Sequence, residues 1–287
     1  MAEFLVIGAV ALDRPIRLNG PISPGARLQG RTLEGALSGR LGGGAANAGV
    51  ALVRAGHRVR LAAFVAADAD GDTALATAQA EGLDTSLVHR RVGASPKTLV
   101  LIDPAGERSI VHLDADFAGL PQLSVPDAIV ATDGLYVRGP YPGAELWAQA
   151  CRGPVVAHWP AGRFKGPCDV LVASADDCNA SDLAAPFAAG LAQVGARLQW
   201  LVLTCGPGEV TAYGPTRSVR VVPQPARVVD ATGAGDVFAA GLLEALGAGA
   251  GIEAALAHAC EWGALAVGLE GSAPTGGHFP AFRPVSP

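Results

Sequence analysis

The sequence predicts an α/β fold built on a doubly wound, mostly parallel sheet with helices on both of its faces. The main observation is that short apolar runs, typical of buried strands, alternate with helical segments along most of the chain. The chain has 287 residues, of which 50% are hydrophobic and 16% charged, which suits a globular protein with a large core. No repeat and no clear linker divides it, so we expect a single domain over residues 1–287.

The first third of the chain predicts two strand–helix pairs. Residues 4–10 and 59–65 are apolar enough for buried strands. One helix is expected to begin within residues 42–47 and to stop at Gly56, and a second is expected over residues 73–81. Residues 14–40 differ in composition, because Gly, Pro and Arg are frequent there. For that segment we expect irregular β structure outside the main core.

A β-hairpin is expected next. Residues 97–102 and 108–113 are its two strands, and the Asp-Pro-Ala-Gly stretch at 103–106 between them fits a type I turn. This hairpin can pair with the preceding irregular segment. We therefore expect a small β lid, formed by about residues 14–40 and 92–116, beside the main sheet.

After residue 125 the alternation of strands and helices resumes. Apolar or β-rich runs that predict strands or short buried segments lie at residues 129–131, 134–137, 155–157, 170–173, 200–204 and 219–229. Helices are expected at residues 145–151, 183–194, 237–246 and 253–269. The tail at 271–287 is rich in Gly and Pro, and we expect it to wrap the surface.

Composition excludes several classes of protein. The formal net charge of −5 and the absence of a basic cluster argue against a nucleic-acid partner. No run approaches the ~20 apolar residues that cross a bilayer, and the apolar start lacks the basic flank of a signal peptide. The 5 cysteines have no Cys-x-x-Cys spacing, so we expect reduced thiols in a cytoplasmic protein.

Familiar nucleotide and metal motifs are missing from the sequence. There is no Walker A loop, and the turn after the first strand carries one glycine, Gly8, where a dinucleotide fingerprint needs more. Asp68, Asp70 and Asp72 resemble the start of a calcium loop. Its required glycine and glutamate are absent, which disfavours calcium.

A glycine turn opens the helix expected at residues 237–246. At the start of a helix, N–H groups without an intrahelical partner and the helix dipole attract anions, most often phosphate, and glycines let a ligand come close. The turn is Gly233-Ala234-Gly235, and Asp236 follows it. A carboxylate beside a phosphate site suits a general base that takes a proton from an attacking hydroxyl. The alternative is that Asp236 only caps the helix.

A second small-residue stretch opens the helix at residues 42–47. It ends in Asn47, whose amide can donate to and accept from hydroxyl groups. Close helix packing is one interpretation of these small residues, and a sugar or nucleoside site is the other. Asp13, expected just past the first strand, is a natural companion because ligands of open α/β sheets bind beyond strand C-termini.

The two stretches together resemble the ribokinase-like (PfkB) family of carbohydrate kinases. The resemblance rests on Gly42-Gly43-x-x-Ala46-Asn47 and on Asp230-x-Thr232-Gly233-Ala234-Gly235-Asp236. Weaker matches extend it over nearly the whole chain: Asp13, Asp68-x-x-Gly71, Gly106-Glu107-Arg108 and Thr204-x-Gly206-x-Gly208.

The resemblance implies a ribokinase-like fold and a role for each matched residue. Asp236 would be the catalytic base. Gly233, Ala234 and Gly235 would form an anion hole for the transferred phosphoryl group. Further residues would bind the sugar (Asp13, Gly43 and Asn47) or line the nucleotide site (Thr204, Gly206, Gly208, Thr232 and His258). The phosphoryl donor would be ATP with Mg²⁺.

Three positions depart from the family pattern. Many members have Asn-x-x-Glu, which helps to organise Mg²⁺, where this chain has Ser174-Ala175-Asp176-Asp177; Asp177 keeps a carboxylate that can act through water. His158 stands where many members carry an Asp-containing segment. Gly139 lies where some members place an acidic sugar contact, and the neighbouring Arg138 either faces an anionic substrate or is structural.

The sequence therefore predicts an ATP-dependent kinase that phosphorylates a hydroxyl of a small sugar or sugar-like polyol. Two alternatives stay open: a nucleoside or vitamin-alcohol kinase of the same fold, and a non-catalytic ligand-binding relative. An exposed lid edge also allows a homodimer through the lid, because unpaired strand edges invite pairing. The particular sugar and the hydroxyl are not determined by the sequence.

Overall fold

The computed structural model describes residues 1–32, 39–105, 108–113, 120–139, 141–159 and 164–283. The strands of its main sheet are β1 (Glu3–Gly8), β5 (Arg58–Ala66), β6 (Asp84–Arg91), β9 (Gly134–Arg138), β10 (Val155–His158), β11 (Val170–Ser174), β12 (Trp200–Thr204), β13 (Val210–Tyr213) and β14 (Ser218–Val221). The helices are α1 (Gly44–Arg54), α2 (Ala69–Ala80), α3 (Ala144–Ala150), α4 (Ala180–Ala184), α5 (Pro186–Val194), α6 (Ala234–Gly247) and α7 (Ile252–Val267), with 3-10 turns η1 (Asp127–Val130) and η2 (Ala175–Asp177).

The main sheet is mostly parallel. In the described part of the chain its nine strands follow the order β14-β13-β12-β11-β10-β9-β1-β5-β6. All neighbours from β12 to β6 are parallel, and β13 and β14 extend one edge as antiparallel strands. The predicted doubly wound, mostly parallel sheet is confirmed.

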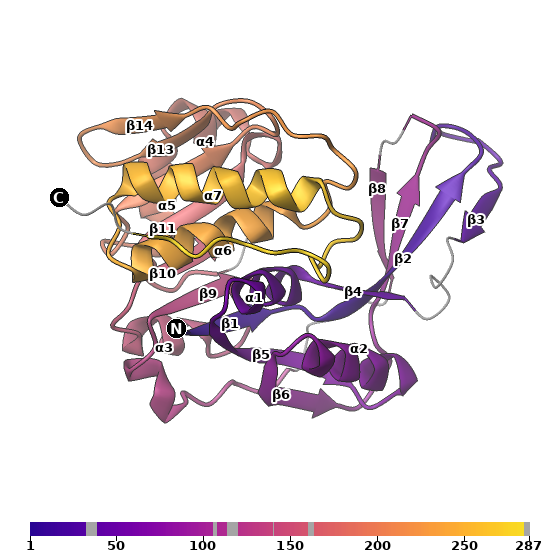
Figure 1. Ribbon diagram of the computed structural model, residues 1–287, viewed down its shortest axis with the longest axis horizontal. Coiled ribbons are helices and arrows are strands. Elements are labelled where there is room, and N and C mark those ends of the chain that lie inside the picture. The colour runs from indigo at the N-terminus through magenta and orange to yellow at the C-terminus, as the bar shows by residue number, and fades with distance from the viewer. Residues whose placement is uncertain (33–38, 106–107, 114–119, 140, 160–163, 284–287) are drawn as a thin grey trace.

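Helices cover both faces of this sheet, as Figure 1 shows. The apolar side chains of α1, α2, α6 and α7 belong to one core, and those of α3 and α5 belong to a second core across the sheet. Strand β1 contributes side chains to both cores. Phe4 and Val6 point into the first core, whereas Leu5 and Ile7 point into the second. A strand buried on both faces has to be apolar at every position, which explains the continuous apolar run.

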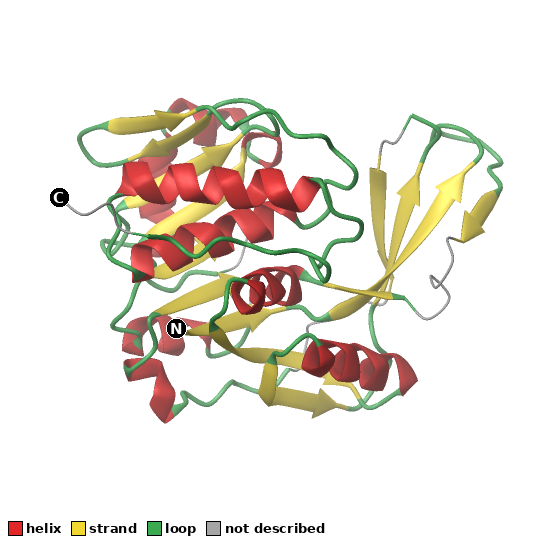
Figure 2. Cartoon of the chain, viewed as in Figure 1, coloured by secondary structure: helices red, strands yellow, loops and turns green. Residues whose placement is uncertain are grey.

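A second, smaller sheet projects from one end of the main sheet, on the side away from both chain termini (Figure 2). It consists of β2 (Ala11–Leu18), β3 (Gly30–Thr32), β4 (Arg40–Gly42), β7 (Lys97–Ile102) and β8 (Arg108–Leu113). Its strand order is β3-β2-β7-β8, and β4 pairs with β2. The predicted hairpin and the predicted irregular segment thus meet in one sheet. Residues 33–38, 106–107 and 114–116 of the expected lid lie outside the described residues.

Several boundaries differ from the sequence prediction. Strands β6 and β13 were not expected: β6 is a half-exposed edge strand and β13 has four residues, so neither has a strong apolar pattern. The run at 219–229 is a strand only as far as Val221, and Pro223 and Pro225, which lack an N–H, follow. The helix expected at 183–194 is divided between α4 and α5, because Ala185 before Pro186 is not helical.

The acidic stretch at residues 68–72 is a helix start. Asp68 caps α2 and accepts a hydrogen bond from the Gly71 N–H at 2.8 Å. Asp70 and Asp72 lie in the first turn of the helix and pair with arginines of other strands. The geometry is that of a capped helix whose acidic residues bond within the protein. No helix in the described residues is both long enough and apolar enough to span a membrane.

Candidate active site

The glycine turn and helix α6 form the centre of the site. Gly233 is the N-cap of α6 in a left-handed conformation (φ 78°), which glycine adopts without strain. A Cβ at this position would also lie 2.8 Å from Asn47 Nδ2, so the turn packs directly against α1. Among the described residues, the N–H groups of Gly233 and Gly235 have no hydrogen-bond partner, whereas Ala234 N–H donates to Ala231 O at 3.3 Å. Two of the three predicted anion-hole donors are therefore free.

Asp236 is buried behind this turn with 8% of its surface exposed. Its Oδ2 accepts a hydrogen bond from Asn47 Nδ2 at 2.9 Å. Its Oδ1 accepts from the Tyr136 hydroxyl at 2.9 Å and from Arg138 Nε at 3.0 Å. No side-chain cap closes the start of α6. The helix-cap interpretation of Asp236 is wrong, because its carboxylate bonds to side chains of α1 and β9.

The surroundings of Asp236 stabilise its charged form. Burial by itself would raise the pKa of Asp236, but the charge of Arg138 and the hydrogen bonds from Asn47 and Tyr136 outweigh it and lower the pKa below the ordinary value. Asp236 is thus ionised at neutral pH and can accept a proton. Gly44 makes this cluster possible: a Cβ there would overlap Arg138 and lie 3.0 Å from Asp236 Oδ1.

Tyr136 was not identified from the sequence. It is fully buried in β9, and burial together with the neighbouring Asp236 raises its pKa well above the ordinary value, so it remains a hydrogen-bond donor. The available signal was its spacing from Arg138. Side chains two residues apart share one face of a strand, so a tyrosine two positions before an arginine at a strand end points to the same site.

His158 lies on the other side of the glycine turn, at the end of β10. Its Nε2 is 3.3 Å from Gly235 O, and its ring meets the Tyr136 ring edge-on with centroids 5.9 Å apart. Burial, and then the charge of Arg138, lower the pKa of His158 to about 4. The imidazole is therefore neutral at pH 7, and this departure from the family pattern adds no charge beside Asp236.

Asp13 and Asn47 lie where the lid meets the main sheet. Asp13, expected just past the first strand, lies in β2, the next strand, and accepts a hydrogen bond from Ser272 Oγ. Burial raises the pKa of Asp13, and the nearby Asp230 and Asp236 add to this. Asn47 Oδ1 is buried and has no hydrogen-bond partner among the described residues. Gly43, with φ 91°, is the N-cap of α1 beside them.

The predicted nucleotide residues are only partly brought together. Thr204 ends β12, and Gly206 and Gly208 lie in the turn after it, where Gly208 N–H donates to Cys205 O at 2.7 Å. Thr232 precedes Gly233, and its buried hydroxyl has no hydrogen-bond partner among the described residues. The side chain of His258 instead packs inside the protein, with Nε2 2.8 Å from Glu244 Oε2.

The structure also locates the predicted magnesium residue. Asp177 is exposed at the end of η2, directly after β11, and its charge acts on Arg138. The described residues contain no group of three or more His, Cys, Asp or Glu side chains placed to hold a metal. Mg²⁺ is usually bound through one or two carboxylates, several waters and the phosphates of a substrate. A lone exposed carboxylate fits that manner of binding.

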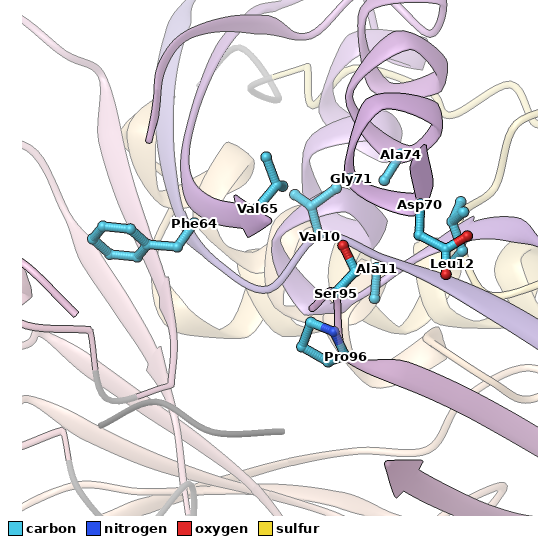
Figure 3. A pocket seen from close by; sticks show the side chains of 10 residues that line it. All are labelled: Val10, Ala11, Leu12, Phe64, Val65, Asp70, Gly71, Ala74, Ser95 and Pro96. Atoms are coloured by element: carbon cyan, nitrogen blue, oxygen red, sulfur yellow. The ribbon is translucent and has the colours of Figure 1, made fainter. Parts of the chain in front are cut away.

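A small cavity lies between the start of β2 and the start of α2, and it is not a ligand site. Figure 3 shows its lining, which comes from β2, the end of β5, the start of α2 and residues 95–96. Its volume is about 10 Å³, which is at most the space of one water molecule. The cavity is therefore too small for a sugar or a nucleotide.

Comparisons with known proteins agree with this geometry. The chain matches the pfkB family of carbohydrate kinases over residues 6–152 and 170–275. Among solved structures, it is similar to a ribokinase from Thermotoga maritima with 18% identity and a TM-score of 0.79, covering 98% of this chain and 97% of that one.

Two further structures have the same fold. One is an Arabidopsis thaliana ribokinase complexed with ribose and ATP, with 18% identity, a TM-score of 0.75 and coverage of 98% of this chain and 96% of that one. The other is a Methanocaldococcus jannaschii nucleoside kinase, with 18% identity, a TM-score of 0.73 and coverage of 98% and 95%. No curated protein sequence matches the chain. Because the family match spans most of its residues and the ribokinase fold spans nearly all of them, the chain belongs to the PfkB family of carbohydrate kinases.

Proposed function

We propose that this protein transfers the γ-phosphoryl group of ATP to a hydroxyl of a small sugar or sugar-like polyol. The observation that carries the proposal is the position of Asp236. It is an ionised, buried carboxylate directly behind a helix start whose Gly233 and Gly235 N–H groups are free among the described residues. A base and an anion site within one turn of chain are what phosphoryl transfer to a hydroxyl requires.

The chemistry follows from these positions. Asp236 takes the proton of the acceptor hydroxyl, whose oxygen forms a bond to the γ-phosphorus as the bond to ADP breaks. The N–H groups of the glycine turn hold the negative charge on the transferred group. In a loose transition state the bond from the acceptor oxygen to phosphorus is only slightly formed, so the hydroxyl has lost little of its proton. A base of lowered pKa therefore suffices. Asp177 would hold Mg²⁺ through water, and the ion would neutralise phosphate charge.

Unpaired polar atoms support the assignment of the two substrates. Asn47 Oδ1 is buried without a partner among the described residues, and a sugar hydroxyl can donate to it. Asp13, next to the lid, can accept from further hydroxyls. On the other side of the turn, the buried Thr232 hydroxyl likewise has no partner among the described residues and can donate to a phosphate oxygen. ATP as donor is supported by the complex of the Arabidopsis ribokinase, which has the same fold.

The direct test is the substitution Asp236→Asn. Asparagine keeps the size of the side chain and one oxygen acceptor but cannot take a proton at neutral pH. We expect turnover with Mg-ATP, measured by coupled ADP release, to fall by about 100-fold or more, while ATP binding is largely retained. Unchanged turnover in this variant would refute the mechanism. The substrate panel should include pentoses, hexoses, sugar acids, sugar phosphates and nucleosides, because a nucleoside or vitamin-alcohol kinase is the remaining alternative.

A non-catalytic relative of these kinases would give a different result. Such a protein would bind ATP or a sugar without metal-dependent turnover of any acceptor. Assays with and without Mg²⁺ across the same panel separate this alternative from the proposed kinase.

A further inference from the structure

Arg138 is paired with the carboxylate proposed to act as the base. It is the last residue of β9, and its Nε donates to Asp236 Oδ1 at 3.0 Å. The side chain is 37% exposed, and Nε is its only hydrogen-bonded atom within the described part of the chain. The two terminal amino groups of the guanidinium are therefore available to a ligand. Arginine offers such groups as a planar pair that matches a carboxylate or a phosphate.

Two arginines of the small sheet have carboxylate partners with no proposed part in the reaction. Arg14 pairs with Asp70 at 2.8 Å, and Arg108 pairs with Asp230 at 3.3 Å. Arg138 differs because its partner is Asp236 itself. The charge of Arg138 is thus balanced by Asp236, the group that has to accept a proton during turnover.

The pair weakens Asp236 as a base. Oδ1 accepts from both Tyr136 and Arg138, and Oδ2 accepts from Asn47, so both oxygens are occupied. Withdrawing Arg138 to solvent would leave the buried Asp236 charge less compensated, which is unfavourable. A neutral polyol supplies no charge to take the place of Asp236 beside Arg138. A second anion does, because it pairs with the guanidinium and leaves Asp236 Oδ1 with the Tyr136 hydroxyl as its only donor among the described residues.

The surroundings of Arg138 suit this exchange. His158 is beside it and uncharged at neutral pH, so it adds no competing charge, and the pKa of Arg138 is raised: burial lowers it, but Asp236 and Asp177 outweigh burial. Two carboxyl groups, those of Asp13 and Asp230, lie on the lid side of the site, close enough for Asp230 to raise the pKa of Asp13. An acidic group would be repelled there and attracted on the β9 side. The acidic group of the acceptor is therefore directed to the β9 side, and its hydroxyls are directed to the lid side.

We propose that the acceptor of this kinase carries an acidic group, a carboxylate or a phosphate, and that Arg138 binds this group and thereby releases Asp236. This inference rests on the proposed function, since it specifies the substrate class of the same site. Arg138 then selects acidic substrates. Because it leaves Asp236 when such a substrate binds, it also makes the base available only after binding.

Binding without turnover tests the exchange directly. Titration calorimetry would compare a sugar acid, a sugar phosphate and the matching neutral sugar on the wild type, Asp236→Asn and Arg138→Gln. Asp236→Asn removes the anion that competes for Arg138, so we expect it to bind the acidic ligand about 10-fold more tightly than the wild type. Arg138→Gln should bind it at least about 10-fold more weakly. The neutral sugar should respond to neither change in this way.

Turnover supplies the second measurement. With Mg-ATP, the wild type should have a kcat/KM for one acidic acceptor at least about 10-fold above that of its neutral counterpart. Arg138→Gln should abolish this preference, and Arg138→Lys should retain part of it because the charge remains. The matched control is Arg90→Gln, which removes the same charge from an exposed pair with Asp72 and should keep the preference. The more active of the two acidic ligands identifies the acidic group as a carboxylate or a phosphate.

The two proposals fail in different ways. If the wild type prefers neutral acceptors and Asp236→Asn binds acids no better than the wild type does, the inference about Arg138 is wrong, while loss of turnover in Asp236→Asn would still support the kinase. If no acceptor is phosphorylated but the acidic ligands bind in the predicted order, the proposed kinase activity is wrong and the anion site stands.

Discussion

Asp236 and the residues around it show how a few side chains determine the chemistry of this site. The sequence identified Asp236, Gly233 and Asn47 because they belong to two short local patterns. The structure adds Tyr136, which donates to Asp236 Oδ1 from β9, 100 residues earlier in the chain. A contact of that separation depends on which strand lies beside which. The local spacing of Tyr136 from Arg138 places the two on one face of a strand, but it does not indicate that this face meets Asp236.

The substitution Tyr136→Phe tests the hydrogen bond to Asp236. Phenylalanine fills the same buried space but leaves Asp236 without one of the donors that lower its pKa. We expect the acid limb of the kcat/KM profile to move to higher pH, because the free enzyme then needs a higher pH to ionise its base. The measurement is a pH–rate profile beside a Tyr213→Phe control in β13. An unchanged acid limb would contradict the assigned role.

The small sheet is the part of the fold that the sequence predicted in outline. Its hairpin was expected because residues 103–106 have the composition of a turn, and Ala105 N–H does donate to Asp103 Oδ1 at 2.8 Å. The sequence did not predict the register of the parallel pairing between β2 and β7, because this pairing joins segments far apart in sequence. Strand β8 is an edge of this sheet and carries exposed Ile110, Val111 and Leu113.

This edge leads to a prediction about assembly. An exposed apolar edge strand favours pairing with a second copy of the chain, so we expect a homodimer that associates through the lid. Light scattering should give twice the mass of one chain for the wild type and the mass of one chain for Ile110→Lys. Arg90→Gln, outside the lid, is the control and should remain dimeric. A wild type that is monomeric at assay concentration would exclude this dimer.

A buried carboxylate links the segments around Ala2 and Phe282 to the helices. Glu244 of α6 is 3% exposed and lies 3.2 Å from His57 Nε2 and 2.8 Å from His258 Nε2. It also accepts from the Phe282 N–H, and His57 in turn accepts from the Ala2 N–H. The sequence had associated His258 with nucleotide binding. In the fold its imidazole belongs to this cluster, and any role with nucleotide stays a prediction.

The cluster predicts how stability depends on pH. Burial would raise the pKa of Glu244, but the close contact with His258 and the hydrogen bonds with His57 and the Phe282 N–H outweigh it and lower the pKa to about 2. Because the folded-state pKa is lowered, its contribution to stability is present above the ordinary value of 4.5 and is lost as pH falls toward 2.

Glu244→Gln is the variant that tests this. At pH 7 we expect the free energy of unfolding in urea to fall by about 2 kcal/mol. The difference from the wild type should shrink as pH falls below 4.5. A constant difference from pH 7 to pH 3 would contradict the assigned role. Glu253→Gln, in an exposed pair with Arg217, is the control and should change stability little.

The sequence was enough to predict the alternation of strands and helices, the glycine turn before α6 and the candidate base. These depend on periodicity and on conformations of a few neighbouring residues, which the local sequence dictates. Only the tertiary structure decided what Asp236 bonds to. Sheet order places β9 beside β1 and brings Arg138, 98 residues earlier, against its carboxylate. This pairing depends on how α6 packs against the sheet. The sequence left open whether Arg138 contacts an anionic substrate or is structural, and the fold shows it paired with the candidate base.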